Sequence, residues 1–275
     1  MAREVSTIAL PHGPTLSFAA QGDQSAVPLL LLPGPTDSWL SYRPVLDQLP
    51  SWNRAVAVSQ RGHGDSNKPA TGYRVEDFAH DAVRLLDALG IERAVLIGHS
   101  GSCLVARRVA IDQPERVAGL VLEASPATLL GDAGLKDFVE SVVSTLQDPI
   151  DTTFARSFVA DTSSPDVTSD LRNDLVRELL KVPARVWREL FDSLLHYDDR
   201  SELARIMAPT LLIWGAADVL VRREMQEELI GRIRSARLLV YPGVGHTPRW
   251  EEPSRFASDV ATFVDQLLHR KPYES

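Results

Sequence analysis

The chain has 275 residues, of which 44% are hydrophobic, and its formal net charge at pH 7 is -8. This length suits one α/β domain with an insertion and is sufficient to bury a large core. The acidic balance and the scattered Lys and Arg residues argue against a nucleic-acid-binding surface, which needs a basic patch.

Cys103 is the only cysteine, so the chain cannot form an intramolecular disulfide. The N-terminal sequence MAREVSTIAL lacks an apolar segment of signal-peptide length. The longest uniformly apolar run, at 29–32, is far shorter than the roughly 20 residues of a membrane-spanning helix. We therefore expect a cytoplasmic protein with no membrane insertion.

The chain begins with a predicted antiparallel hairpin. Two segments of alternating hydrophobicity, VSTIAL and TLSFAAQG, flank the turn-forming sequence PHGP at 11–14. Six short aliphatic runs follow, most of them separated by segments with helical periodicity. Their sequences are PLLLLPG, AVAVSQ, AVLIGH, AGLVLEAS, PTLLIWG and RLLVYPG. Continuous apolar strands separated by helices indicate a parallel sheet covered on both faces.

Apolar residues recur at helical spacing over 75–89 and 256–267, which predicts two helices that face the core. From about 127 to 205 the sequence has no strand pattern, only amphipathic helical stripes and a polar, turn-rich segment at 160–170. We interpret 127–205 as a helical cap on the carboxyl edge of the sheet, where open α/β sheets bind ligands. Residues 1–126 and 206–275 then form the core.

The sequence GHSGS places Ser100 between an apolar strand and a helix. A G-x-S-x-small sequence in this context is typical of a nucleophile elbow, a sharp turn that presents the serine hydroxyl above the sheet. Gly98 meets the requirement for a small residue before the turn, and Ser102 stands where glycine is more usual. Taken alone, the pentapeptide is equally compatible with a turn that ends in a helix-capping serine.

A reactive serine needs a base, and a third group must hold that base in place. Among the seven histidines, His246 is the best placed, because it follows the last predicted strand in a loop with two glycines. The acid is expected between the serine and the histidine in chain order. Asp218 follows a buried strand and a Gly-Ala-Ala turn, and Glu123 at the end of AGLVLEAS is the alternative acid. We favour Asp218 for its position in the loop.

Five landmarks occur in order along nearly the whole chain: LLLLPGPTDSW, QRGHGDS, GHSGS, LLIWGAAD and GVGHTPRWEEP. Together they resemble the α/β-hydrolase fold superfamily. The resemblance implies a mostly parallel eight-stranded sheet flanked by helices, with a helical cap inserted after the sixth strand. It also implies Ser100 as nucleophile, Asp218 as acid and His246 as base. Because the elbow carries Ser rather than Asp, the chain is more similar to the esterases than to the haloalkane dehalogenases or epoxide hydrolases.

The loop after the third strand departs from the family pattern. Members commonly carry His-Gly there, and the residue after this glycine donates a backbone N–H to the oxyanion. Here the segment reads Pro33, Gly34, Pro35, and proline has no N–H. Losing one such donor costs about 3 kcal/mol of transition-state stabilisation. We therefore expect the oxyanion hole to use the Gly101 N–H and Thr36, through its N–H or its hydroxyl.

Aromatic residues in the cap and after this loop predict an apolar pocket. Its expected lining residues are Trp39, His99, Phe138, Phe158, Trp187 and Phe191. The sequence therefore predicts a hydrolase that cleaves small to medium apolar carboxylic esters or lactones through an acyl-enzyme. The alternatives are a C–C bond hydrolase or perhydrolase of the same fold, or a ligand receptor with residual hydrolase activity.

Motifs for other chemistries are missing from the sequence. It contains no H-E-x-x-H or paired-cysteine spacing for zinc, no phosphate-binding G-x-x-x-x-G-K-[ST] and no dinucleotide-binding G-x-G-x-x-G. We therefore expect no metal and no cofactor. The expected partner is a small-molecule substrate, and the expected state is a monomer or homodimer.

Overall fold

Residues 3–269 are described by the computed structural model, and they form an eight-stranded sheet in the order β1-β2-β4-β3-β5-β6-β7-β8. The antiparallel pairs are β1 with β2 and β2 with β4, and all other neighbours are parallel. The strands are β1 (Glu4–Ala9), β2 (Thr15–Gln21), β3 (Pro28–Leu32), β4 (Arg54–Ser59), β5 (Ala94–His99), β6 (Val117–Glu123), β7 (Thr210–Gly215) and β8 (Ala236–Tyr241). The predicted N-terminal hairpin and the predicted mostly parallel sheet are confirmed.

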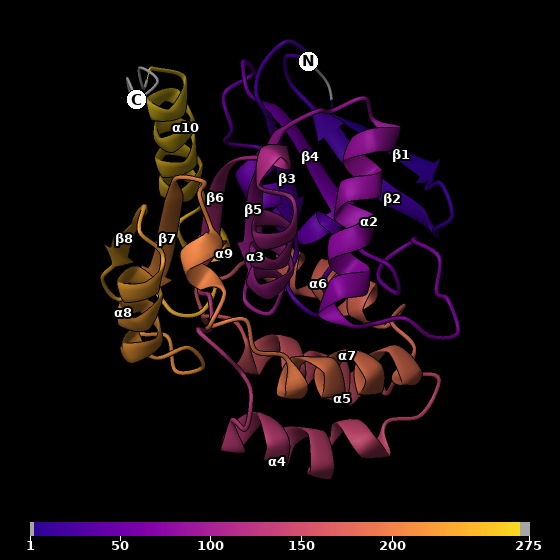
Figure 1. Ribbon diagram of the computed structural model, residues 1–275. Coiled ribbons are helices and arrows are strands. Elements are labelled where there is room, and N and C mark those ends of the chain that lie inside the picture. Colours follow the sequence, from indigo (N-terminus) through magenta and orange to yellow (C-terminus); the bar gives the residue numbers. More distant parts are fainter. Residues whose placement is uncertain (1–2, 270–275) are drawn as a thin grey trace.

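Helices cover the sheet and one of its ends. Those outside the long connection from β6 to β7 are α1 (Arg43–Leu46), α2 (Val75–Ala88), α3 (Ser102–Asp112), α8 (Arg223–Arg232), α9 (Pro248–Glu251) and α10 (Pro253–His269). The connection itself holds α4 (Ala133–Ser141), α5 (Thr152–Asp161), α6 (Ser169–Leu179) and α7 (Ala184–His196). Figure 1 shows these four helices together beyond one end of the sheet.

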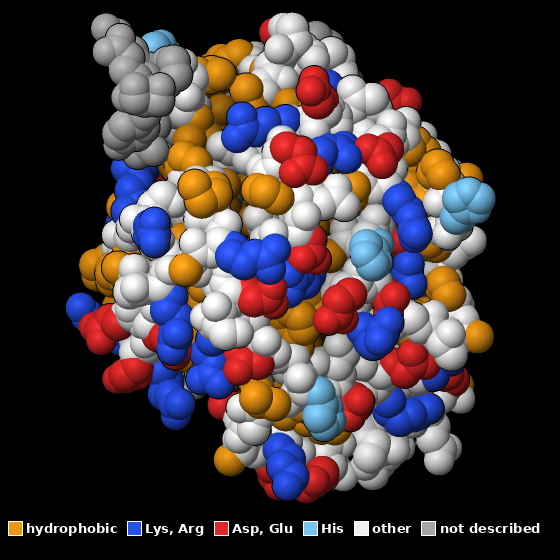
Figure 2. Space-filling model, in the orientation of Figure 1, with side chains coloured by type: hydrophobic (Ala, Val, Ile, Leu, Met, Phe, Trp, Pro, Cys, Tyr) orange, Lys and Arg blue, Asp and Glu red, His pale blue; other side chains and the backbone are white. Residues whose placement is uncertain are grey.

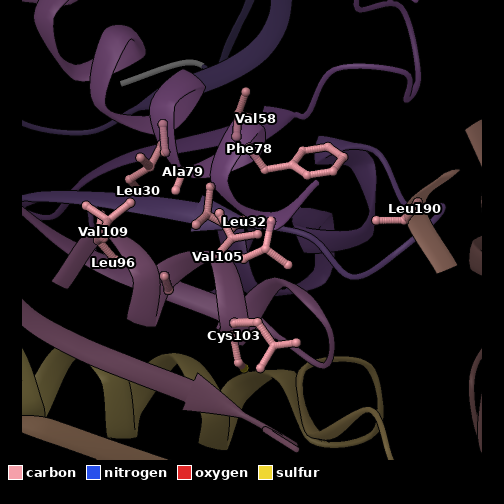
Figure 3. Close-up of a cluster of buried hydrophobic side chains, with 14 of the residues drawn as sticks. Leu30, Leu32, Val58, Phe78, Ala79, Leu96, Cys103, Val105, Val109 and Leu190 are labelled. Carbon is pink, nitrogen blue, oxygen red and sulfur yellow. The ribbon is translucent and has the colours of Figure 1, made fainter. Parts of the chain in front are cut away.

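The central strands are apolar throughout because both of their faces are buried. In β3, Leu30 and Leu32 point into a cluster that includes side chains of α2 and α3, whereas Leu29 and Leu31 join a second cluster against α10. Figure 3 shows part of the first cluster, which contains Leu30, Leu32 and Leu96 of the sheet together with Phe78 of α2. A strand between two helical layers therefore has no polar face.

Three of the four helices between β6 and β7 begin at a capping side chain. Asp132, Asp151 and Thr168 each accept a hydrogen bond from the backbone N–H three residues later, at the starts of α4, α5 and α6. Such caps satisfy N–H groups that a helix leaves unpaired in its first turn. Leu190 of α7 reaches the first core cluster and joins these helices to the rest of the molecule.

One buried arginine contacts both ends of this connection. Arg107 of α3 donates hydrogen bonds to the carbonyl oxygens of Pro126 (2.7 Å) and Ala127 (3.1 Å). It also forms an ion pair with Asp199 at 2.7 Å, and both side chains are fully buried. The helix that follows Ser100 is thereby joined to the segments where the chain leaves the sheet and returns to it.

No helix within residues 3–269 combines the length and the apolar character needed to cross a bilayer.

Candidate active site

Ser100 occupies a sharp turn between β5 and α3. Its φ of +51° lies in the left-handed region, and its N–H donates to the Glu123 carbonyl oxygen at 2.9 Å. A Cβ on Gly98 would lie 2.8 Å from the Ser102 carbonyl oxygen and 2.9 Å from Cys103 Cα. Only glycine fits at position 98, which is the geometric reason for the elbow sequence.

Ser102, which stands where glycine is more usual, forms two hydrogen bonds through its hydroxyl. Its Oγ donates to the carbonyl oxygen of Pro33 and accepts a hydrogen bond from Gln60 Nε2 at 2.9 Å. Gln60 Nε2 also donates to the Pro33 carbonyl oxygen, at 3.1 Å. The elbow helix is therefore bound to the loop after β3 by a buried polar network.

His246 and Asp218 are brought together by two loops at the ends of β7 and β8. His246 Nδ1 lies 2.9 Å from Asp218 Oδ2, and the Asp218 side chain is fully buried. The other carboxylate oxygen of Asp218 accepts hydrogen bonds from the N–H groups of Leu220 (2.8 Å) and Val221 (3.0 Å). Both oxygens of the buried carboxylate are thus satisfied, and the imidazole is held in one orientation.

Glycine allows these two loops to approach closely. A Cβ on Gly215 would lie 2.1 Å from the Gly245 carbonyl oxygen. The carboxylate of Glu251 accepts hydrogen bonds from the N–H groups of Gly245 (3.0 Å) and Thr247 (3.3 Å) on either side of His246. The sequence analysis did not single out Glu251, although its place in GVGHTPRWEEP is close to the histidine.

Glu123, the alternative acid, is engaged by Arg249. Its Oε1 accepts from the Arg249 N–H at 2.9 Å and its Oε2 from Nη1 at 3.3 Å. Burial raises the pKa of the Glu123 carboxyl to about 7, against the opposing effect of Arg249. Because the Nδ1 of His246 bonds Asp218, the geometry favours Asp218 over Glu123 as the partner of the imidazole.

His99 supports the loop that carries His246. Its Nε2 lies 3.1 Å from the His246 carbonyl oxygen, which can only accept, so Nε2 carries the proton. Burial, with the charges of Arg249 and His246, lowers the pKa of His99 well below its usual value. A Cβ on Gly34 would lie 2.5 Å from His99 Nδ1, so the loop after β3 needs glycine at that position.

The loop after β3 forms a tight turn over the elbow. The Asp37 N–H donates to the Gly34 carbonyl oxygen at 3.1 Å, and Thr36 has a φ of +73°. A Cβ on Gly101 would lie 2.8 Å from Pro35 Cγ, so the proline ring lies directly against the residue that follows Ser100. Thr36 itself is buried at 1% exposure.

A cavity of about 560 Å³ lies between these loops and the helices α4, α5 and α7. Ser100, Gly101, Pro35 and His246 line it, but Thr36 does not. Of the six predicted pocket residues, the cavity is lined by His99, Phe138, Phe158 and Phe191. Its position above the elbow makes it the candidate substrate site.

The prediction was wrong for the two tryptophans. Trp187 is fully buried among the helices between β6 and β7. The centroid of its ring lies 5.0 Å from that of Phe158 and 5.5 Å from that of Phe191. Trp39 packs against the second core cluster, on the other side of the sheet. Both indoles belong to hydrophobic cores rather than to the cavity wall.

Asp37 and Arg249 extend the site beyond the predicted residues. Arg249 Nη2 donates to Asp37 Oδ2 at 2.8 Å, and the guanidinium lies over the Trp250 ring at 4.3 Å. Burial raises the pKa of the Asp37 carboxyl to about 6. The two residues are 212 positions apart, so no local sequence signal could have paired them.

Among residues 3–269, no group of three or more His, Cys, Asp or Glu side chains is arranged to hold a metal ion.

Comparison with known families decides the classification of the fold. The family model described as alpha/beta hydrolase fold matches residues 27–253. The chain belongs to this family. The matched range includes Ser100, Asp218 and His246.

Several relatives of this alpha/beta hydrolase span most of its length. The 3-oxoadipate enol-lactonase 1 of Acinetobacter baylyi is 27% identical, with 93% of this chain and 95% of that protein covered. Epoxide hydrolase 3 of Xenopus tropicalis is 24% identical, with 92% of this chain and 76% of that protein covered. The solved structure of the esterase RhEst1 from Rhodococcus sp. superposes with a TM-score of 0.83 at 26% identity, with 96% of this chain and 99% of that chain covered.

Proposed function

We propose that this alpha/beta hydrolase cleaves small to medium apolar carboxylic esters or lactones through an acyl-enzyme on Ser100. The observation that carries the proposal is the hydrogen bond of 2.9 Å between His246 Nδ1 and Asp218 Oδ2. It lies beside the same cavity that Ser100 lines from its strained turn. A serine, a histidine and a buried carboxylate in this order are the components of an activated nucleophile.

Because Asp218 binds Nδ1 of His246, only Nε2 of this imidazole is available to act as a base. With Nδ1 engaged, Nε2 is the nitrogen that removes the Ser100 proton as the hydroxyl attacks the carbonyl carbon. The imidazolium then protonates the leaving alcohol, and the neutral imidazole activates the water that releases the acid. The buried Asp218 carboxylate stabilises the positive charge that His246 carries between these steps.

The oxyanion hole uses Gly101 in this proposal. Among the described residues, neither the Gly101 N–H nor the Thr36 N–H has a hydrogen-bond acceptor. Gly101 lines the cavity, whereas Thr36 is buried and does not line it. We assign one donor to Gly101. Thr36 was predicted as the second donor, but it does not line the cavity, so we leave it out of the proposed oxyanion hole.

The connection at 127–205 is the cap in this proposal, and 1–126 with 206–275 is the core. Phe138, Phe158 and Phe191 of the cap line the cavity above Ser100. Their apolar rings favour an apolar acyl or alcohol group over a strongly hydrated one. The relatives named as an enol-lactonase and an esterase support ester and lactone bonds as the class of substrate.

A labelling and turnover experiment tests the proposal. A fluorophosphonate probe should label the wild-type protein at Ser100, and p-nitrophenyl butyrate should be hydrolysed over many turnovers. Ser100→Ala should abolish labelling and lower kcat by about 10⁴-fold or more. Ser144→Ala, at an exposed serine outside the cavity, is the matched control. Turnover that persists in Ser100→Ala would refute the mechanism, and a single turnover in wild type would favour a ligand receptor.

A further inference from the structure

The wall of the cavity carries more negative than positive charge. Asp37, Asp132 and Asp161 line it, and Arg222 is the one Lys or Arg side chain among its described residues. Asp161 and Arg222 are exposed at the rim, where water weakens their fields. Asp37 is different, because it lies on the loop beside Ser100 and only 16% of its side chain is exposed to solvent.

Arg249 does not neutralise the charge at this position completely. The guanidinium bonds Asp37 on one side and Glu123 on the other, at 2.8 Å and 3.3 Å. Arg249 and Glu123 are fully buried, so Asp37 is the member of the cluster that meets the cavity. With both carboxyls ionised, two negative charges share one positive charge, and the cluster has a net charge of -1.

The surroundings make this charge effective over several ångströms. Phe138, Phe158 and Phe191 also line the cavity, and aromatic rings screen charge poorly compared with water. A carboxylate on a bound substrate would face the charge of the Asp37 cluster inside this apolar cavity. A methyl group in the same place would meet no repulsion.

We propose that the cavity discriminates against substrates that carry a carboxylate, and that Asp37 is the residue that determines this preference for neutral esters. The inference rests on the proposed ester hydrolysis and narrows its substrate class. Repulsion between like charges is a recognised way for a binding site to exclude competing ligands.

A matched pair of substrates tests the preference. p-Nitrophenyl butyrate and mono-p-nitrophenyl succinate have acyl groups of similar size, but the succinate ends in a carboxylate where the butyrate ends in a methyl group. At pH 8 and low ionic strength, kcat/KM for the succinate should be about ten- to hundredfold lower, as expected for two like charges some 7 Å apart at an effective dielectric constant near 20. Added salt at 0.5 M should reduce the difference only partly, because the charge is shielded from solvent.

Three variants assign the effect to the cluster. Asp37→Asn keeps an acceptor for Arg249 but removes the charge, so the ratio of the two kcat/KM values should fall to within about threefold of unity. In Glu123→Gln, Arg249 pairs with Asp37 as its only carboxylate, and the cluster becomes neutral. This variant should therefore also reduce the ratio of the two kcat/KM values. Asp170→Asn, at an exposed position outside the cavity, should leave the ratio unchanged.

Two results would overturn the inference. One is equal or faster hydrolysis of the succinate by wild type, as would follow if Arg222 captured the anion. The other is an unchanged ratio of the two kcat/KM values in both Asp37→Asn and Glu123→Gln. Cooperative thermal unfolding of each variant would show that both are folded. Failure of the proposed function is distinguishable, because wild type would then turn over neither ester.

Discussion

At the scale of single residues, the site depends on backbone conformations that few side chains adopt. Ser100 and Thr36 both have positive φ, +51° and +73°. A β-branched residue in that region costs of order 1–3 kcal/mol and persists only where its surroundings impose it. Here the turn from Gly34 to Asp37, with Pro35 against Gly101, imposes it.

Pro35→Ala should increase the rate of hydrolysis. The substitution restores an N–H at the cavity wall, where the proline ring now lies against Gly101. A second oxyanion donor is worth up to about a hundredfold in kcat. We expect kcat on p-nitrophenyl butyrate to rise at least tenfold with little change in KM. An unchanged kcat would mean that Thr36 already supplies the second donor.

Asp218→Asn and Glu123→Gln should differ sharply in activity on the neutral butyrate ester. Asparagine at 218 would no longer hold the imidazole in the required tautomer, and kcat should fall by about 10⁴-fold. Glutamine at 123 should keep kcat within about tenfold of wild type, because Glu123 bonds Arg249 rather than the imidazole. Steady-state kinetics of the two variants gives the answer. Equal losses would return Glu123 to consideration as the acid.

At the scale of elements, the elbow helix and the connection from β6 to β7 meet at Arg107. Its guanidinium bonds Pro126 and Ala127 at one end of the connection and Asp199 at the other, all without solvent exposure. Because α3 begins two residues after Ser100, this contact joins the turn at Ser100 to the start and the end of the connection from β6 to β7. A buried ion pair of this kind is costly to break from one side.

Arg107→Met should lower the free energy of unfolding by about 3–5 kcal/mol, because it leaves Asp199 buried without its cation and removes the hydrogen bonds to the Pro126 and Ala127 carbonyl oxygens. Urea unfolding followed by circular dichroism measures the change. Arg232→Met, which removes an exposed pair with Glu228, is the control and should cost less than about 1 kcal/mol. Similar losses in the two variants would contradict the role assigned to Arg107.

At the scale of the whole molecule, charge is spread over the surface and concentrated in few buried places. Figure 2 shows basic and acidic side chains interspersed on one face of the protein. On this face, acidic side chains therefore have basic side chains near them, and both kinds are in contact with water. The cluster of Asp37, Arg249 and Glu123 is largely shielded from water, so the ionisation of its two carboxyls changes the stability of the fold.

Stability should fall between pH 5 and pH 8 in wild type relative to the double variant Asp37→Asn/Glu123→Gln. Burial raises the pKa values of Asp37 and Glu123 to about 6 and about 7, above those of the unfolded chain. The contribution of such groups is present at low pH and is lost as pH rises through the folded-state values. We expect a relative loss of about 1–4 kcal/mol in urea unfolding. A constant difference across this range would show that neither carboxyl titrates there.

The sequence by itself determined the strands, the elbow and the order of the site. Short apolar runs bounded by turn residues and separated by helical segments indicate strands buried on both faces. G-x-S-x-small between a strand and a helix forms a tight turn that needs a small residue at position 98, which Gly98 supplies. These are local properties of pattern and steric fit. They placed Ser100, Asp218 and His246 at the carboxyl ends of strands before any contact was known.

Only the tertiary structure decided which buried side chains meet the cavity and which ion pairs form. Trp187 and Phe191 share one helical stripe, yet Phe191 lines the cavity and Trp187 packs inside the cap. Arg249 is 212 residues from Asp37 and 126 from Glu123, and only the parallel sheet brings their loops to one edge. Helical periodicity reports that a side chain is buried, but what it is buried against depends on packing between distant segments.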